Sequence, residues 1–288
     1  WQGRHESASA DDWQFSCDAT DLADASAVLV TVKGAATPDA AAAIAQHAPK
    51  DALVVSFQNG IGNDQVLRNG VEQTVLAGMV PFNVAYQGNG LFHCGTEGLL
   101  SIEKGDDRQN QLSAALEKAG LTTEVHPDML PVQWGKLLLN LNNPVNALSG
   151  QPLKAQLENG GYRKVVAACL KEALALLKRA GIKPKRTGKA IPALLPWIMA
   201  LPDPLFRRVA QSMLRVDPKA TSSMADDLQR GRTTEIDFIN GEVVRLAESL
   251  GRDAPVNRAV VAEIKRAEQA GSGSPALSAS ELQAKVLS

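Results

Sequence analysis

The chain has 288 residues, of which 44% are hydrophobic, enough for one large domain or two ordinary ones. Its net charge of −1 gives no support to nucleic acid or another polyanion as a partner. The cysteines Cys17, Cys94 and Cys169 are widely spaced and form no CxxC pair, which disfavours a disulfide framework or a zinc site and fits a reducing compartment.

The first part of the chain alternates strand and helix patterns. Residues 1–26 are polar, with a short strand expected at 14–17. Apolar runs predict three buried parallel strands, at 27–33, 52–57 and 74–80. Helices are expected between them, at 38–47 and around Val66 and Leu67. The β–α–β–α–β order predicts a right-handed, parallel, doubly wound sheet.

The next stretch contains shorter elements. Residues 91–93 and 98–102 are expected to form a hairpin across a turn at 95–98, followed by a helix at 108–119 and a strand at 122–125. No GxGxxG motif occurs, and the nearest pattern, Gly88-Asn-Gly90, precedes a strand, so it is interpreted as a hairpin turn. The glycine-rich turn that opens a dinucleotide-binding fold is therefore missing.

Beyond residue 127 the pattern changes to long helical periods, and we place the domain boundary there: an α/β domain at 1–127 and an all-helical domain at 128–288. Helices are expected at 130–148, 161–180, 188–200, 205–213, 223–230, 235–250 and 256–268. The tail after Gly271, rich in Gly, Ser and Pro, is expected to be loose. No apolar run reaches 18 residues and no signal peptide is evident, so we expect a soluble, cytoplasmic protein with no membrane partner.

Two of the predicted strand ends are polar. Ligands of open parallel sheets lie beyond the carboxyl ends of the strands, where this chain has Lys33 and the run Asn59-Gly60-Ile61-Gly62. Lys33 can pair with a phosphate, and Asn59 can bond a ribose or carbonyl group. Ordinary turn chemistry remains the simpler interpretation of Asn59 taken alone, since Asn-Gly is a common turn.

A polar stripe follows in the helical half, within 134–149. At 100° per residue, Asn140 lies one turn beyond Lys136, and Asn143 falls within about 20° of Lys136. Pro144 disfavours helical geometry at Asn143, so the helix should kink or stop there. Two interpretations remain open: a solvated helix face, or a polar pocket that grips a carboxylate or carbonyl.

A third polar run lies at 221–237. Thr234 and Asp237 fit a capping box that would start a helix near Glu235. A glutamate in the first turn of a helix is favoured by the helix dipole. The functional alternative places Glu235 opposite Lys136 in an interdomain cleft. The four histidines show no metal-ligand spacing and are interpreted as structural or surface residues: His5, His47, His93 and His126.

Together and in this order, the segments VLVTVKG, SFQNGIGN, WGKLLLNLNNPVNALSG and TSSMADDLQRGRTTEIDFINGEVVRLAESLG resemble the ketopantoate reductase (2-dehydropantoate 2-reductase) family. The resemblance implies a Rossmann-like domain, here without its first βαβ unit, and a helical domain of the 6-phosphogluconate dehydrogenase C-terminal-like type. It also implies NADPH-dependent reduction of a 2-oxo acid in the cleft between them, and a homodimer is one option for the assembly.

The resemblance also assigns roles to residues. Lys136 would be the general acid and Glu235 its catalytic partner, in contact with the substrate or the nicotinamide ribose. The implied substrate ligands are Asn59, Asn140, Asn143 and Ser223, and the implied cofactor contacts are Lys33, Asn59, Val84 and Glu235. A Lys ammonium suits this role, because hydride addition to a ketone leaves negative charge on oxygen that needs a proton.

Three departures from the family pattern bear on specificity. The first βαβ unit and its cofactor-selecting Arg are missing, so we expect roughly 20 or more further residues upstream and weak NADP(H) binding by the 288 residues alone. Asn143 follows Lys136 after seven residues instead of eight, and Gln151 stands near the place of a further Asn.

We therefore expect an NADP-dependent reductase of ketopantoate in pantothenate synthesis. A reductase of another branched or bulky 2-oxo acid, or a catalytically silent nucleotide-binding regulatory protein, is the alternative. The sequence leaves the choice of NADP or NAD open.

Overall fold

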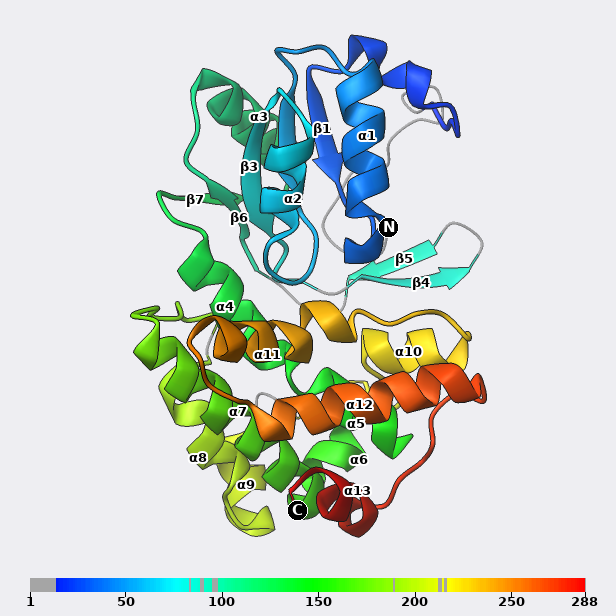
Figure 1. The fold of residues 1–288 in the computed structure, drawn as a ribbon, viewed down its shortest axis with the longest axis vertical. Coiled ribbons are helices and arrows are strands. Elements are labelled where there is room, and N and C mark those ends of the chain that lie inside the picture. The colour runs from blue at the N-terminus through cyan, green and yellow to red at the C-terminus, as the bar shows by residue number, and fades with distance from the viewer. Residues whose placement is uncertain are drawn as a thin grey trace. The chain divides into compact units, whose positions relative to one another are not determined.

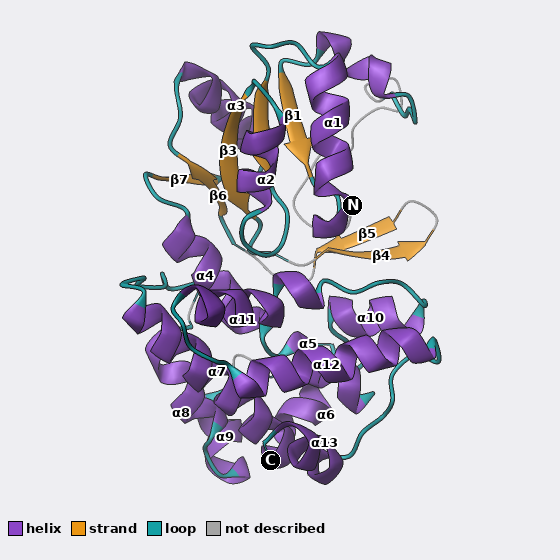
Figure 2. Cartoon of the chain, viewed as in Figure 1, coloured by secondary structure: helices purple, strands orange, loops and turns teal. Residues whose placement is uncertain are grey.

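The computed structural model describes residues 14–82, 84–88, 91–94, 98–188, 190–211, 214 and 217–287. The chain divides into two compact units, Trp1–Gln133 and Trp134–Ser288. The first combines a sheet with helices, and the second is built from helices (Figure 2). The predicted fold class, an α/β region followed by an all-helical one, is confirmed.

The first unit is organised around a five-stranded sheet of order β1-β2-β3-β6-β7. Its strands are β1 (Ala27–Val30), β2 (Leu53–Ser56), β3 (Thr74–Met79), β6 (Leu100–Glu103) and β7 (Thr123–His126). As predicted, β1, β2 and β3 run parallel. The antiparallel pairing of β6 with β3, and the parallel pairing of β6 with β7, complete the sheet.

Helices cover both faces of this sheet (Figure 1): α1 (Thr37–His47), α2 (Asn63–Gly70) and α3 (Asp107–Lys118). Strand β2 shows how the faces are divided, because its side chains alternate. Val54 packs with Ile44 and Leu67 on the α1–α2 side, whereas Leu53 and Val55 belong to the cluster that α3 covers. All three helices match their sequence predictions.

Two predictions for the first strands are wrong. Residues 14–17 form no strand; Asp18 instead accepts a hydrogen bond from the Thr20 backbone N–H and opens the short 3-10 helix η2 (Ala19–Asp24). The segment at 27–33 was expected to be buried throughout, but Leu29 is 42% exposed. The reason is that β1 is an edge strand of the described sheet.

The predicted hairpin is also wrong in its pairing. The antiparallel pair is β4 (Val84–Gly88) with β5 (Leu91–Cys94). The hairpin turn predicted at Gly88-Asn-Gly90 includes residues 89 and 90, which lie outside the described residues. Strand β6 joins the central sheet instead of pairing with β5. Its successive residues Leu100, Ser101 and Ile102 are all buried, as suits a strand covered on both faces.

The second unit is a bundle of helices around α7. Helix α4 (Leu130–Asn140) precedes the bundle along the chain. The α-helices of the bundle are α5 (Asn143–Ser149), α6 (Leu153–Glu158), α7 (Gly160–Arg179), α8 (Leu195–Met199), α9 (Asp203–Val209), α10 (Ser223–Gln229), α11 (Asn240–Ser249), α12 (Pro255–Ala270) and α13 (Ala279–Val286). Two 3-10 helices, η4 (Pro192–Leu194) and η5 (Ile236–Phe238), lie between them. Helix α7 packs against α5, α6, α8, α11, α12 and α13. Within the described ranges no helix is both long and apolar enough to span a membrane.

Two features of this bundle test sequence predictions. The helix expected at 130–148 is interrupted between Asn140 and Asn143, next to Pro144, as predicted. The expectation of a loose tail after Gly271 is wrong. Ser278 and Glu281 form a capping box at the start of α13, whose Leu282 is fully buried, and the Tyr162 hydroxyl donates to the Leu277 carbonyl oxygen at 2.8 Å.

Candidate active site

The polar stripe in the second unit lies where α4 ends and α5 begins. Lys136, Asn140 and Asn143 are each half-buried, while Leu137 and Leu138 between them are buried in the core. The amphipathic spacing of α4 therefore turns its leucines inward and leaves Lys136 and Asn140 one turn apart along the helix.

Lys136 has an unusual protonation equilibrium. Burial lowers its pKa from the ordinary value near 10.5 to about 8, and the opposing negative charge of Glu235 raises it. The charge of Glu235 therefore acts on Lys136, whereas the interdomain cleft of the functional alternative stays a prediction. An ammonium with a pKa of about 8 is a better proton donor near neutral pH than an unperturbed lysine.

The turn that carries Lys136 is fixed by a close backbone contact. A Cβ on Gly135 would collide with the carbonyl oxygen of Lys185, so only a glycine lets the 185–187 segment approach α4 here. This contact holds the helix backbone next to Lys136 in one position.

A buried joint connects α5 to α10. The side chain of Asn146, fully buried, accepts a hydrogen bond from the Ser222 backbone N–H at 2.9 Å and donates to the Gln151 carbonyl at 2.8 Å. The Ser222 hydroxyl lies 3.1 Å from the Asn143 carbonyl oxygen. Ser223, exposed at the first position of α10, is therefore held beside Asn143.

Glu235 sits on the segment that precedes α11, and the capping box predicted there is wrong. The Thr234 hydroxyl accepts from the Ile236 backbone N–H at 3.2 Å, and Asp237 pairs with Lys265 instead of closing a box. Glu235 therefore occupies the cap position of the 3-10 turn η5, and the α-helix begins only at Asn240. Glu235 is half-buried.

In the first unit, a network of neutral side chains joins the loops that follow β1 and β2. The Gln58 amide nitrogen donates to the Val32 carbonyl at 3.0 Å and to the Thr37 hydroxyl at 2.7 Å. Asn63 lies 3.1 Å from the same hydroxyl and donates to the Asn59 carbonyl at 2.9 Å. The network fixes the backbone on either side of Lys33 and at Asn59.

Lys33 and Asn59, two of the predicted cofactor residues, lie next to this network, and Val84 lies on another strand of the same unit. Lys33 is exposed at the end of the β1 loop, and Asn59 is half-buried. Gly60 and Gly62 adopt φ of +89° and +86°, a conformation that favours glycine and leaves the backbone open. Val84, 42% exposed, begins β4 in the same unit.

Sequence reasoning missed the residues that hold these side chains in place, notably Gln58, Asn146 and Ser222. A sequence signal was present for Asn146, because it is a polar residue between Val145 and Ala147 in the mostly apolar α5, whose residues 144–149 are all buried. A buried polar residue must find partners, so its position announces a structural hydrogen bond.

Comparison with known proteins agrees with this architecture. Two family models match: ketopantoate reductase PanE/ApbA over residues 4–107, and the ketopantoate reductase PanE/ApbA C terminal over 128–268. An α/β unit followed by a helical unit that carries a lysine on α4 and amides on α4 and α5 thus fits a reductase of two-domain type. The chain belongs to the ketopantoate reductase family.

Individual relatives cover most of the chain. A 2-dehydropantoate 2-reductase of Pyrococcus horikoshii is 26% identical over 255 residues, 86% of this chain and 77% of the relative. The crystal structure of a PanE/ApbA family ketopantoate reductase from Ralstonia eutropha has a TM-score of 0.75 and 31% identity, covering 89% of this chain and 80% of that one. A D-mandelate dehydrogenase, solved with NADH and anilino(oxo)acetate, shares the fold at a TM-score of 0.68 and 19% identity, with 85% and 77% covered.

Proposed function

We propose that this chain catalyses the NADPH-dependent reduction of ketopantoate (2-dehydropantoate) to pantoate. The observation that carries the proposal is Lys136, half-buried beside the charge of Glu235, with a pKa lowered to about 8. The family to which the chain belongs, and its similarity to a 2-dehydropantoate 2-reductase, support this choice of reaction.

The residues of the first unit fit a pyridine nucleotide. The loops beyond β1 and β2 lie at the carboxyl ends of parallel strands, where nucleotides bind in open sheets. Lys33 offers an exposed ammonium for a phosphate, and the open backbone at Gly60 allows close approach. Asn59, whose carbonyl the network fixes, can bond the nucleotide or the substrate.

In the proposed mechanism, each side chain of the second unit has one task. NADPH, when bound, supplies the hydride that reduces the ketone. The Lys136 ammonium donates a proton to the carbonyl oxygen as negative charge develops there. Asn140 orients that oxygen, and Asn143 with Ser223 holds the substrate carboxylate. Glu235 keeps Lys136 protonated, because its negative charge raises the pKa of the lysine against the effect of burial.

One observation favours a second candidate, a reductase of another branched or bulky 2-oxo acid. Asn143 follows Lys136 after seven residues instead of the eight of the family pattern, and it begins the new helix α5. The D-mandelate dehydrogenase of similar fold was solved with anilino(oxo)acetate, a ligand larger than ketopantoate. The choice of NADPH over NADH, the homodimer and the cytoplasmic location stay predictions.

A substrate panel tests the proposal. The natural protein is assayed with NADPH, and separately with NADH, against ketopantoate, 2-oxoisovalerate and benzoylformate. We expect the highest kcat/KM with ketopantoate and NADPH. A higher kcat/KM with benzoylformate would replace ketopantoate by a bulkier substrate, and no nucleotide oxidation with any of the three would support a catalytically silent protein.

A further inference from the structure

The short segment that carries Glu235 is held from both sides by one helix. On one side of Glu235, the Thr234 backbone N–H donates to the Glu268 carboxylate at 2.7 Å. On the other, Asp237 accepts from the Lys265 ammonium at 2.5 Å. Both anchoring side chains come from α12, so Glu235 lies between two fixed points.

The two anchors also stabilise each other. Lys265 and Glu268 are three residues apart on α12, and their charged groups lie 3.4 Å from each other. The Glu268 side chain is only 14% exposed, which strengthens its charge-assisted bond to the Thr234 N–H. The ion pairs therefore form a small network and not an isolated surface contact.

Helix α12 is itself a firm base for this network. Its first turn is held by Glu172, whose carboxylate accepts from the backbone N–H groups of Val256 and Asn257 at 2.9 and 3.0 Å. Its apolar face buries Val260 and Ile264 completely. The α12 backbone that carries Lys265 and Glu268 is therefore held in the core of the bundle.

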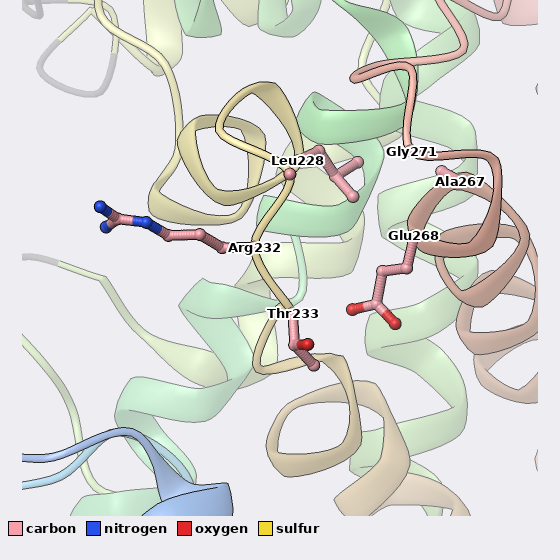
Figure 3. A pocket seen from close by; sticks show the side chains of 7 residues that line it. Leu228, Arg232, Thr233, Ala267, Glu268 and Gly271 are labelled. Atoms are coloured by element: carbon pink, nitrogen blue, oxygen red, sulfur yellow. The ribbon is translucent and has the colours of Figure 1, made fainter.

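A small hollow lies beside Thr233, where the segment that carries Glu235 begins. Figure 3 shows the Glu268 carboxylate reaching from α12 toward Thr233, across a small hollow. The hollow is lined by Leu228, Gly231, Arg232, Thr233, Ala267, Glu268 and Gly271. On the side of this hollow the backbone is held by the bond to Glu268, whereas on the other side of Glu235 the fully buried Ile236 packs into the core.

We infer that Glu268 and Lys265 are positioning residues that set the distance between Glu235 and Lys136. The inference rests on the proposed function only for its kinetic consequences. The charged side chains that contact the Glu235 segment are Lys265 and Glu268 of α12 and Arg245 of α11, which donates to the Asp237 carbonyl. Glu235 in turn acts on Lys136. Losing an anchor should let Glu235 move away and lower the pKa of Lys136 further. Less of the lysine is then protonated at neutral and alkaline pH, and proton transfer slows.

The test compares three variants with a matched control in the natural protein. Glu268→Ala removes the acceptor for the Thr234 N–H, whereas Glu268→Gln removes the charge and keeps an acceptor oxygen. Lys265→Gln releases Asp237. The control is Glu263→Ala, also on α12 and mostly buried, which pairs with Arg266 and Lys285. The readouts are kcat and KM for ketopantoate, the pH at which kcat falls, and the ¹³Cε NMR titration of Lys136.

We expect Glu268→Ala to lower kcat about tenfold, because a displacement of the order of 1 Å at a catalytic group has effects up to 100-fold. Its KM for NADPH should not change, and both the alkaline fall of kcat and the Lys136 titration should move to lower pH. Glu268→Gln should restore most of kcat. Lys265→Gln should show a weaker form of the same defect, and Glu263→Ala should lower Tm without moving the titration.

Three results would overturn the inference: a folded Glu268→Ala variant with normal kcat and titration, a Glu268→Gln variant as impaired as Glu268→Ala, or a Glu263→Ala variant with the same titration shift. If Glu268→Ala fails to fold, an unchanged titration in Lys265→Gln decides against it. Because the NMR titration needs no turnover, it still tests the positioning if ketopantoate is not reduced and the proposed function itself fails.

Discussion

The polar groups at the strand ends of the first unit and those on the helices of the second are held in different ways. In the first, Gln58, Thr37 and Asn63 are neutral, buried and bonded to one another. In the second, Lys136 and Glu235 carry charge and remain half-buried. Neutral amides and hydroxyls keep their bonds across the working pH range, whereas a lysine with a pKa of about 8 titrates within it.

This contrast distinguishes residues that stabilise the fold from residues that take part in the proposed reaction. A buried amide that loses its partner costs about 1–3 kcal/mol of stability, because the orphaned group is not solvated. A half-buried lysine contributes little to folding, yet its proton can decide the rate of a reduction. Substitutions in the first unit should therefore appear mainly in stability and cofactor affinity, and those in the second mainly in kcat.

The largest expected effect is that of Lys136→Ala. A general acid that also stabilises the developing alkoxide should lose about 10²–10⁴-fold in kcat while the fold is retained. The measurement is steady-state NADPH oxidation with ketopantoate, with circular dichroism to confirm folding. Lys164→Ala, which removes an exposed lysine from α7 in the same unit, is the matched control and should behave like the wild type.

Asn140→Ala should have an intermediate effect. One lost hydrogen bond to the substrate costs about 1–3 kcal/mol in kcat/KM for the 2-oxo acid. We expect a higher KM for ketopantoate, a lower kcat and an almost unchanged KM for NADPH. If NADPH affinity alone suffers, Asn140 is not a substrate ligand and belongs with the nucleotide site.

The smallest catalytic effect is expected from Gln58→Leu. This change removes the donor to Val32 and Thr37, so it should lower the free energy of unfolding by about 1–3 kcal/mol and weaken NADPH binding, with kcat at saturation little changed. Thermal melting and a fluorescence titration measure both. Gln65→Leu, at an exposed position on α2, is the control. A large loss of kcat in Gln58→Leu with normal stability would contradict the expectation that first-unit substitutions affect mainly stability and cofactor affinity.

Local patterns were enough to predict much of the fold. Apolar runs located β2 and β3, helical periods located α7 and α12, and Pro144 marked the break before α5. The failures concern long-range pairing. The run at 100–102 shows that a strand forms, but it does not show that its neighbours are β3 and β7 and not β5.

The candidate site shows the same limit. Lys136 and Asn140 share a helix face, so their proximity follows from the spacing alone. The contact between Asn146 and Ser222 joins positions 76 residues apart, and the bond between Thr234 and Glu268 spans 34, so neither leaves a local signal. The α13 capping box, by contrast, was visible as Ser278 and Glu281 but was obscured by the Gly- and Ser-rich stretch before it.

The central claim is that Lys136 donates the proton and that Glu235 keeps it charged. Its most direct test is the pH dependence of kcat/KM for ketopantoate in the wild type and in Glu235→Gln. An acid acts while protonated, so wild-type activity should be full below the pKa of about 8 and fall above it. Glu235→Gln removes the charge that raises this pKa, so its activity should be moderately reduced and should fall at lower pH. An alkaline fall at the same pH in both proteins, or none in the wild type across this range, would contradict the account.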